Sequence, residues 1–87
     1  MAGKYWTITS AGNLAMDNGP ATLVTVNVNT ALASAVFTIY DNTTGAGTKI
    51  ATIDASTGGT RIFAAKAKIG LYGVLSGANA DITVVTQ

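Results

Sequence analysis

Apolar and polar side chains alternate along short runs of this chain, and the runs recur at intervals of about ten residues. In the clearest run, Val24, Val26 and Val28 alternate with threonine and asparagine. A period of two places one set of side chains in a core and the other in solvent, as in a half-buried strand. No stretch sustains the i, i+3, i+4 spacing of an amphipathic helix. The pattern predicts six or seven strands, at residues 5–9, 22–28, 35–40, 48–53, 60–67, 69–75 and 80–86.

The segments between these runs carry residues that form turns. Residues 10–21 are predicted to be a long loop that contains the turn pair Asn18-Gly19, and residues 29–34 to be a loop or a short helical turn. Fourteen threonines, seven valines and seven isoleucines favour strands, because branched side chains pack well on a pleated sheet. We therefore expect one all-β domain, a small β-sandwich or barrel of mainly antiparallel strands.

One stretch, GAGTK at residues 45–49, contains the letters of a phosphate-binding loop. A true P-loop reads Gly-x4-Gly-Lys-Ser/Thr and is followed by a helix, whose N-terminal amides bind the phosphate. Here the lysine follows the threonine, and a strand pattern lies on both sides. The stretch therefore predicts a β-hairpin, in which Asp41 and Asn42 can bond back to the turn amides and the glycines tolerate positive φ.

Charged residues are scarce, at 10% of the chain against about 25% in typical soluble domains. The net charge is +1, which gives no electrostatic basis for binding nucleic acid. No apolar run approaches the ~20 residues of a membrane helix. The chain has no cysteine, so neither a disulfide nor a thiolate metal site reinforces its core. The neutral surface is either hydrated by threonine and asparagine or covered by other subunits.

Catalytic side chains are also scarce. Histidine and cysteine, the usual general base and nucleophile, are absent. The four carboxylates, Asp17, Asp41, Asp54 and Asp81, each fall at a predicted strand end or turn, where aspartate commonly forms turns. We interpret them as turn formers rather than as a catalytic pair or a hard-metal site. We expect no enzyme, and no catalytic, cofactor-binding or metal-binding residue.

Residues 1–9 are predicted to be either an N-terminal arm or the first strand, and residues 10–87 the β-sandwich domain. As an arm, the segment could add a strand to the edge of a neighbouring subunit's sheet. Tyr5, Trp6 and Ile8 would then anchor it and form a candidate interface.

Tyr72 is a further candidate interface residue, because amphipathic tyrosine rings suit subunit seams. Filling of the core or of a strand face is the alternative for this ring. It lies in the predicted strand 69–75, which contains Gly70 and Gly73. Glycine within a strand often marks a bulge or a close approach of another backbone. The two glycines therefore indicate packing against another chain or a sharply bent sheet.

Two segments together resemble small structural proteins of tailed bacteriophages. The first, FTIYDNTTGAGTKIATI, is similar to a hairpin of the form (V/T)xYDNTxxxGTKIAxI. The second, GLYGVLSGANADITVVTQ, is similar to a closing segment of the form GLxVxxSGxxADxTVxY, although it ends in Val-Val-Thr-Gln rather than in an aromatic or basic residue. The likeness covers residues 21–87 and carries no catalytic signature.

The resemblance implies a non-enzymatic virion structural protein, assembled in the host cytoplasm. Its expected role is that of a capsid decoration or cement protein that stabilises the phage head. The expected partners are the major capsid protein and further copies of the chain, with a trimer favoured, and neither nucleic acid nor membrane. A tail or head-fibre accessory protein is one alternative, and a carbohydrate- or receptor-binding β-module is another.

Overall fold

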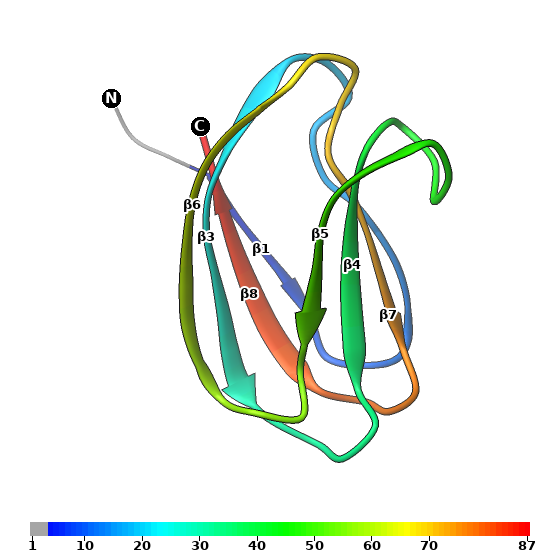
Figure 1. Ribbon diagram of the computed structural model, residues 1–87, viewed down its shortest axis with the longest axis vertical. Helices are drawn as coiled ribbons and strands as arrows, with labels where there is room; N and C mark the ends of the chain where they lie inside the picture. The colour runs from blue at the N-terminus through cyan, green and yellow to red at the C-terminus, as the bar shows by residue number, and fades with distance from the viewer. Residues whose placement is uncertain (1–3) are drawn as a thin grey trace.

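The computed structural model describes residues 4–87, which form eight β-strands and no helix (Figure 1). All strand pairs are antiparallel and they form two four-stranded sheets. Sheet A contains, in spatial order, β1 (Lys4–Ile8), β8 (Asp81–Thr86), β3 (Ala21–Thr30) and β6 (Gly59–Ala67). Sheet B contains β2 (Gly12–Ala15), β7 (Tyr72–Ser76), β4 (Val36–Asp41) and β5 (Thr48–Asp54). The all-β, antiparallel prediction is thereby confirmed.

One hydrophobic core takes side chains from both sheets. Ile82 and Val84 alternate with partly exposed residues along β8, and Phe37 and Ile39 do the same along β4. Burying a large apolar side chain contributes about 1.5–3 kcal/mol, so these residues dominate the stability of the fold. The largest fully buried apolar side chains are Phe37, Leu23, Ile39, Leu71, Leu75, Ile82, Val26 and Val84.

The expected number of strands was wrong, because eight form rather than six or seven. The additional strand, β2, lies within residues 10–21, which were predicted to be a loop. Its Gly12 and Asn13 are poor strand formers, so local preference gives no sign of it. Pairing with β7, where Leu14 lies opposite Gly73, makes this segment a strand.

A β-bulge changes the predicted faces of β3. Its pairing with β8 shifts between Leu23 and Thr25 and leaves Val24 as the extra residue, whereas the shift with β6 at the same place leaves the extra residue on β6, between Ile62 and Ala65. Leu23 and Val26 are therefore both fully buried although they are three positions apart, whereas Val24 is half-buried. The prediction that Val24 faces the same side as Val26 was wrong for this reason.

The first and last strands are neighbours in sheet A. Lys4 lies opposite Thr86, so the N-terminal end of β1 and the C-terminal end of β8 lie at one end of the molecule (Figure 1). Of the predicted arm or first strand at residues 1–9, Lys4–Ile8 pairs with β8 of the same chain, and residues 1–3 lie outside the described residues.

Candidate functional site

The turn between β4 and β5 is a β-hairpin loop and has no phosphate cradle. The Asn42 side chain organises it: its Oδ1 accepts a hydrogen bond from the Thr43 amide, and its Nδ2 donates one to the Ala46 carbonyl (both 2.8 Å). Gly47 adopts φ +94°, and a β-carbon at this position would lie 2.7 Å from Asn42 Nδ2. Lys49 lies within β5, opposite Tyr40, and no helix follows. The hairpin prediction is confirmed.

This hairpin loop also folds onto the outer face of sheet B. A β-carbon on Gly45 would lie 3.0 Å from Val74 Cγ2 and 3.3 Å from Tyr72 Cε1, so the glycine packs directly on these two side chains. Tyr72 and Val74 are consequently only partly exposed. The loop thus covers part of sheet B.

Asp41 links the hairpin to the loop between β6 and β7. Its carboxylate accepts hydrogen bonds from the amides of Ile69 (2.8 Å), Lys68 (3.0 and 3.1 Å) and Gly70 (3.4 Å). These bonds, that from Ile69 foremost, lower the pKa of Asp41 because they stabilise its charged form. They hold the segment between β6 and β7 against the end of β4, and β7 begins after this segment, at Tyr72.

Asp41 therefore does not bond back to its own turn, as its position in the sequence had indicated. Its role in the fold nevertheless remains structural.

The other carboxylates also bind groups of their own chain. Asp17 forms an ion pair with Lys4 (2.6 Å) and has a side chain only 9% exposed. Within the described residues its second oxygen, Oδ2, is buried without a hydrogen-bond partner. Asp54 accepts hydrogen bonds from the hydroxyl and the amide of Ser56, which lower its pKa. Asp81 accepts one from the Asn29 amide group (3.3 Å).

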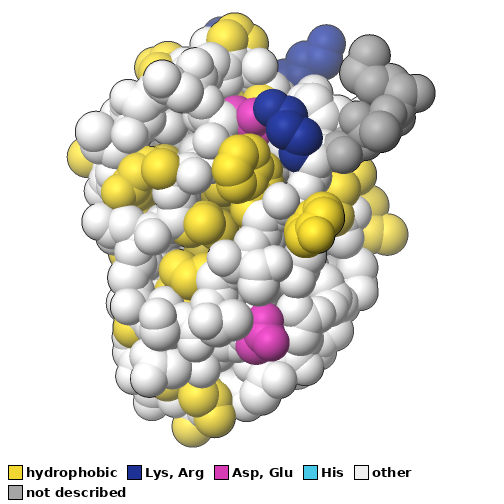
Figure 2. All heavy atoms as spheres, turned by 180° about the vertical axis from the view of Figure 1, so that it is seen from behind, with side chains coloured by type: hydrophobic (Ala, Val, Ile, Leu, Met, Phe, Trp, Pro, Cys, Tyr) yellow, Lys and Arg dark blue, Asp and Glu magenta, His cyan; other side chains and the backbone are white. Residues whose placement is uncertain are grey.

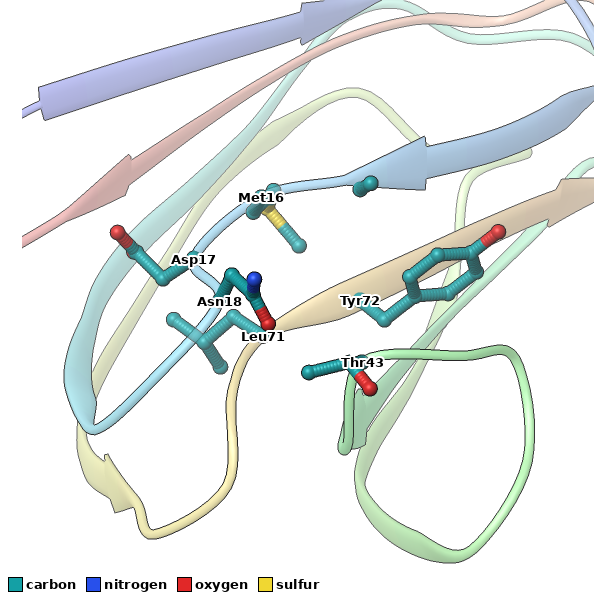
Figure 3. Close-up of a pocket in the computed structure, with 7 residues that line it drawn as sticks. Met16, Asp17, Asn18, Thr43, Leu71 and Tyr72 are labelled. Atoms are coloured by element: carbon teal, nitrogen blue, oxygen red, sulfur yellow. The ribbon is translucent and has the colours of Figure 1, made fainter.

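A pocket of about 400 Å³ lies where the hairpin loop meets the start of β7 (Figure 3). The Asp17 carboxylate points away from the Thr43 and Tyr72 side chains, so it does not face the same space (Figure 3). The pocket therefore presents a tyrosine ring, a hydroxyl and an amide rather than an acid. It is lined by Ala15, Met16, Asp17, Asn18, Thr43, Leu71 and Tyr72.

Residues 4–87 contain no group of three or more His, Cys, Asp or Glu side chains that could hold a metal ion. No helix among them is long and apolar enough to cross a membrane.

The four predicted interface residues do not share one surface. Tyr5 is 75% exposed on the outer face of sheet A. Ile8 belongs to the core, and Trp6 is half-buried on the same side of β1, with its Nε1 donating to Thr86 Oγ1 (3.1 Å). Tyr72 lies on the other sheet, under the hairpin loop. Of these four residues, Tyr5 alone is exposed on the outer face of sheet A.

Sequence reasoning missed the most exposed large apolar side chain, Ile62 on β6, which is 83% exposed. The registers place it in a row that crosses the whole of sheet A: Tyr5 lies opposite Val85, Val85 opposite Thr25, and Thr25 opposite Ile62. The alternation of side chains along β6 could have predicted its exposure. Phe63 and Ala65 pack against the core, so Ile62 points outward.

The next row on the outer face of sheet A is polar and uncharged. It runs from Thr7 through Thr83 and Asn27 to Thr60. Thr60 donates to Asn27 Oδ1 (2.6 Å), Asn27 donates to the Asn29 side chain, and Asn29 donates to Thr83 Oγ1 (2.8 Å). Because these groups already bond to one another, covering them costs less than covering side chains that depend on water.

The molecule as a whole presents few charges. The view from behind shows uncharged atoms over most of that side, with hydrophobic side chains spread across its middle (Figure 2). We define the two rows described above, from Tyr5 to Ile62 and from Thr7 to Thr60, as the neutral face of sheet A. It is the candidate interaction surface.

No protein-family model matches this sequence, and no curated protein matches it. The function is therefore inferred from the motif residues and from the geometry of the neutral face.

Proposed function

We propose that this chain is a non-enzymatic structural protein of a bacteriophage virion, a decoration or cement subunit that binds the outside of the head and stabilises it. The observation that carries the proposal is the neutral face of sheet A, which combines exposed apolar side chains with polar groups that bond to one another. Such a face binds a protein surface by shape and apolar contact. The partners in this proposal are the major capsid protein and further copies of the chain.

The residues of the resemblance support this proposal, because each has a role in building a scaffold. In the hairpin motif, Asp41 binds loop amides and Asn42 organises the turn. In the closing segment, Gly73 packs against the Phe37 ring, and Gly77 adopts φ +88° beside the Ser34 carbonyl. The motif residues therefore hold the loops and strands in place, which suits a subunit of a larger assembly.

The size of the neutral face favours binding at many sites at once. Four strands spaced about 4.8 Å apart, over the roughly four residues of about 3.3 Å that the two rows span, present roughly 250 Å². A standard stable interface takes about 800 Å² from each partner. One face alone therefore binds weakly, whereas several linked copies on a repeating lattice bind strongly through avidity. A trimer that sits on a symmetry axis of the head satisfies this requirement.

The test uses purified undecorated heads of a phage whose virion carries a protein with both sequence motifs. We expect the protein to co-sediment with the heads and to raise the temperature at which they release DNA. Thr25→Lys, which places a charge in the middle of the neutral face, should weaken binding by about tenfold or more. Thr52→Lys, on the exposed side of β5 in sheet B, is the matched control and should bind as the wild type does. Equal binding by both variants would exclude the neutral face as the contact.

Two alternatives keep the same fold. A tail or head-fibre accessory protein would be located at a site other than the head surface in electron micrographs of the native particle. A carbohydrate- or receptor-binding module is favoured by the neutral pocket beside Tyr72, whose volume suits a small ligand. Saturable binding of a sugar that Tyr72→Ala abolishes, together with no binding to heads, would support the module instead.

A further inference from the structure

Sheet A ends in two strands whose outer edges have no partner among residues 4–87. β1 is at one edge and β6 at the other. Exposed edges present unpaired amides and carbonyls that can pair with another chain, and natural proteins usually protect them with proline, short strands or bulges. β6 is nine residues long and contains no proline. It carries one extra residue relative to β3, between Ile62 and Ala65, so residues 59–62 are the regular part of this edge.

The two edges also carry the two most exposed large apolar side chains of the described residues. Tyr5 on β1 is 75% exposed and Ile62 on β6 is 83% exposed. They lie on one face and at the two ends of one row, through Val85 and Thr25. A copy placed beside another in the same orientation would therefore bring these two side chains together.

We propose that copies of this chain join edge to edge, with β6 of one copy pairing with β1 of the next in the register that places Ile62 opposite Tyr5. Strand direction alternates across sheet A, so β6 and the β1 of a neighbour in the same orientation are antiparallel. The sheet then continues from one copy to the next without a change of pairing type. The proposal rests on the building-subunit role proposed above and specifies how the copies are linked.

The register gives four of the five residues of β1 a suitable opposite, and places the fifth, Ile8, opposite Gly59. Tyr5 meets Ile62 as an aromatic and β-branched pair, and Thr7 meets Thr60, both of which are favourable cross-strand pairs. On the inner side, Trp6 lies opposite Arg61 and Lys4 opposite Phe63. These are pairs of a cation with an aromatic ring. No two like charges lie directly opposite one another.

Other pairings use these edges less well. Pairing of β6 with a second β6 about a two-fold axis at Phe63 places Ile62 opposite Ala64 and leaves Tyr5 exposed. In sheet B, the edge strand β2 has only four residues, and neither β2 nor the other edge, β5, carries one of the exposed large apolar side chains of the described residues. Pairing of β6 with β1 is head-to-tail, so it produces a closed ring or an open filament.

Cross-linking tests the register directly, because the chain has no cysteine of its own. The Tyr5→Cys and Ile62→Cys variants are mixed and treated with a short bis-maleimide. We expect covalent dimers in the mixture and few in either variant alone. Lys66→Cys replaces Ile62→Cys in the control, because Lys66 lies on the same face about 13 Å further along β6. Equal yields from the two mixtures would overturn the register, and so would an absence of dimers.

A second measurement keeps the proposal testable if cysteine disturbs the fold. Sedimentation of the wild-type protein at millimolar concentration should show species larger than the monomer, and Ile62→Lys should remove at least nine-tenths of them. Thr52→Lys is again the control and should not change the distribution. A monomeric wild type, or an unchanged Ile62→Lys, would contradict the proposal.

Binding to heads is measured separately from this self-association. Linked copies that fail to bind any head would refute the decoration role and leave the edge pairing intact. Binding to heads by a protein that never links edge to edge would refute the edge pairing and leave the decoration role intact.

Discussion

Replacing Gly73 with alanine tests the packing between the two halves of sheet B. A β-carbon at this position would lie 2.5 Å from Phe37 Cζ and 2.8 Å from Phe37 Cε1, with Met16 Cε at 3.4 Å. Carbon atoms pack best at about 3.5–4.0 Å, so the ring would have to retreat by about 1 Å. Phe37 is fully buried within the core cluster, so it has no free space in which to move.

We expect Gly73→Ala to destabilise the protein by about 2 kcal/mol, within the range of 1–3 kcal/mol found for overpacked cores. In a domain of this size, about 1 kcal/mol lowers Tm by roughly 4–8 °C, so the expected decrease is roughly 8–16 °C. The cause is the ring, not the loss of glycine flexibility, because no positive φ is required at Gly73. A smaller side chain at position 37 should therefore relieve the strain.

Thermal and urea unfolding of four proteins would measure this effect: the wild type, Gly73→Ala, Phe37→Leu and the double variant. The double variant should be more stable than the sum of the two single losses predicts, by at least about 1 kcal/mol. Gly58→Ala is the control, because its β-carbon would meet only the Val28 carbonyl at an ordinary 3.6 Å. Additive losses, or a Gly73→Ala protein as stable as the wild type, would refute the packing explanation.

Three further predictions concern other parts of the fold. Asp41 has a lowered pKa in the folded state, so its contribution to stability is present above about pH 4 and is lost as the pH falls through the folded-state pKa. Asp41→Ala should therefore lower Tm at neutral pH and make Tm depend less on pH in acid. An unchanged slope of Tm against pH would contradict this. Thr86→Val leaves Trp6 Nε1 without its acceptor and should lower the free energy of unfolding by about 1 kcal/mol, whereas Thr86→Ser should be close to wild type. Urea unfolding monitored by tryptophan fluorescence would measure both. Gly77→Ala should lower the free energy of unfolding by at least about 3 kcal/mol, more than Gly73→Ala does. The new β-carbon would lie 1.9 Å from the Ser34 carbonyl oxygen, in a backbone at φ +88°. A soluble Gly77→Ala protein with a wild-type Tm would count against that geometry.

The alternation of side chains was sufficient to predict most of the fold. It located seven of the eight strands and the hairpin between β4 and β5, because both depend on local signals. Ile82 and Val84, for example, are buried as the period of two requires. The same reasoning predicted a hairpin rather than a P-loop, and strands do lie on both sides of the glycine-rich turn.

Features that depend on distant partners were not predictable in this way. The strand β2 forms because β7 pairs with it, and Val24 becomes an extra residue only because β3 pairs with β8. The opposite orientations of Tyr5 and Trp6 have a local cause, because adjacent residues of one strand point to opposite faces of the sheet. The pairing of Tyr5 with Val85 and Thr25, and hence with the row that ends at Ile62, required the sheet order.

The antiparallel neighbours β1 and β8 bring the first and last described residues to one end of the molecule. A short linker from Gln87 to Lys4 could therefore turn these strands into a covalent hairpin. New ends could then be opened in the exposed turn at residues 56–58, between β5 and β6. In such a circular permutant the core pairing would be unchanged. A peptide joined to Gln87 of the original chain would emerge from the end where Lys4 lies opposite Thr86, at a distance from the β5–β6 turn.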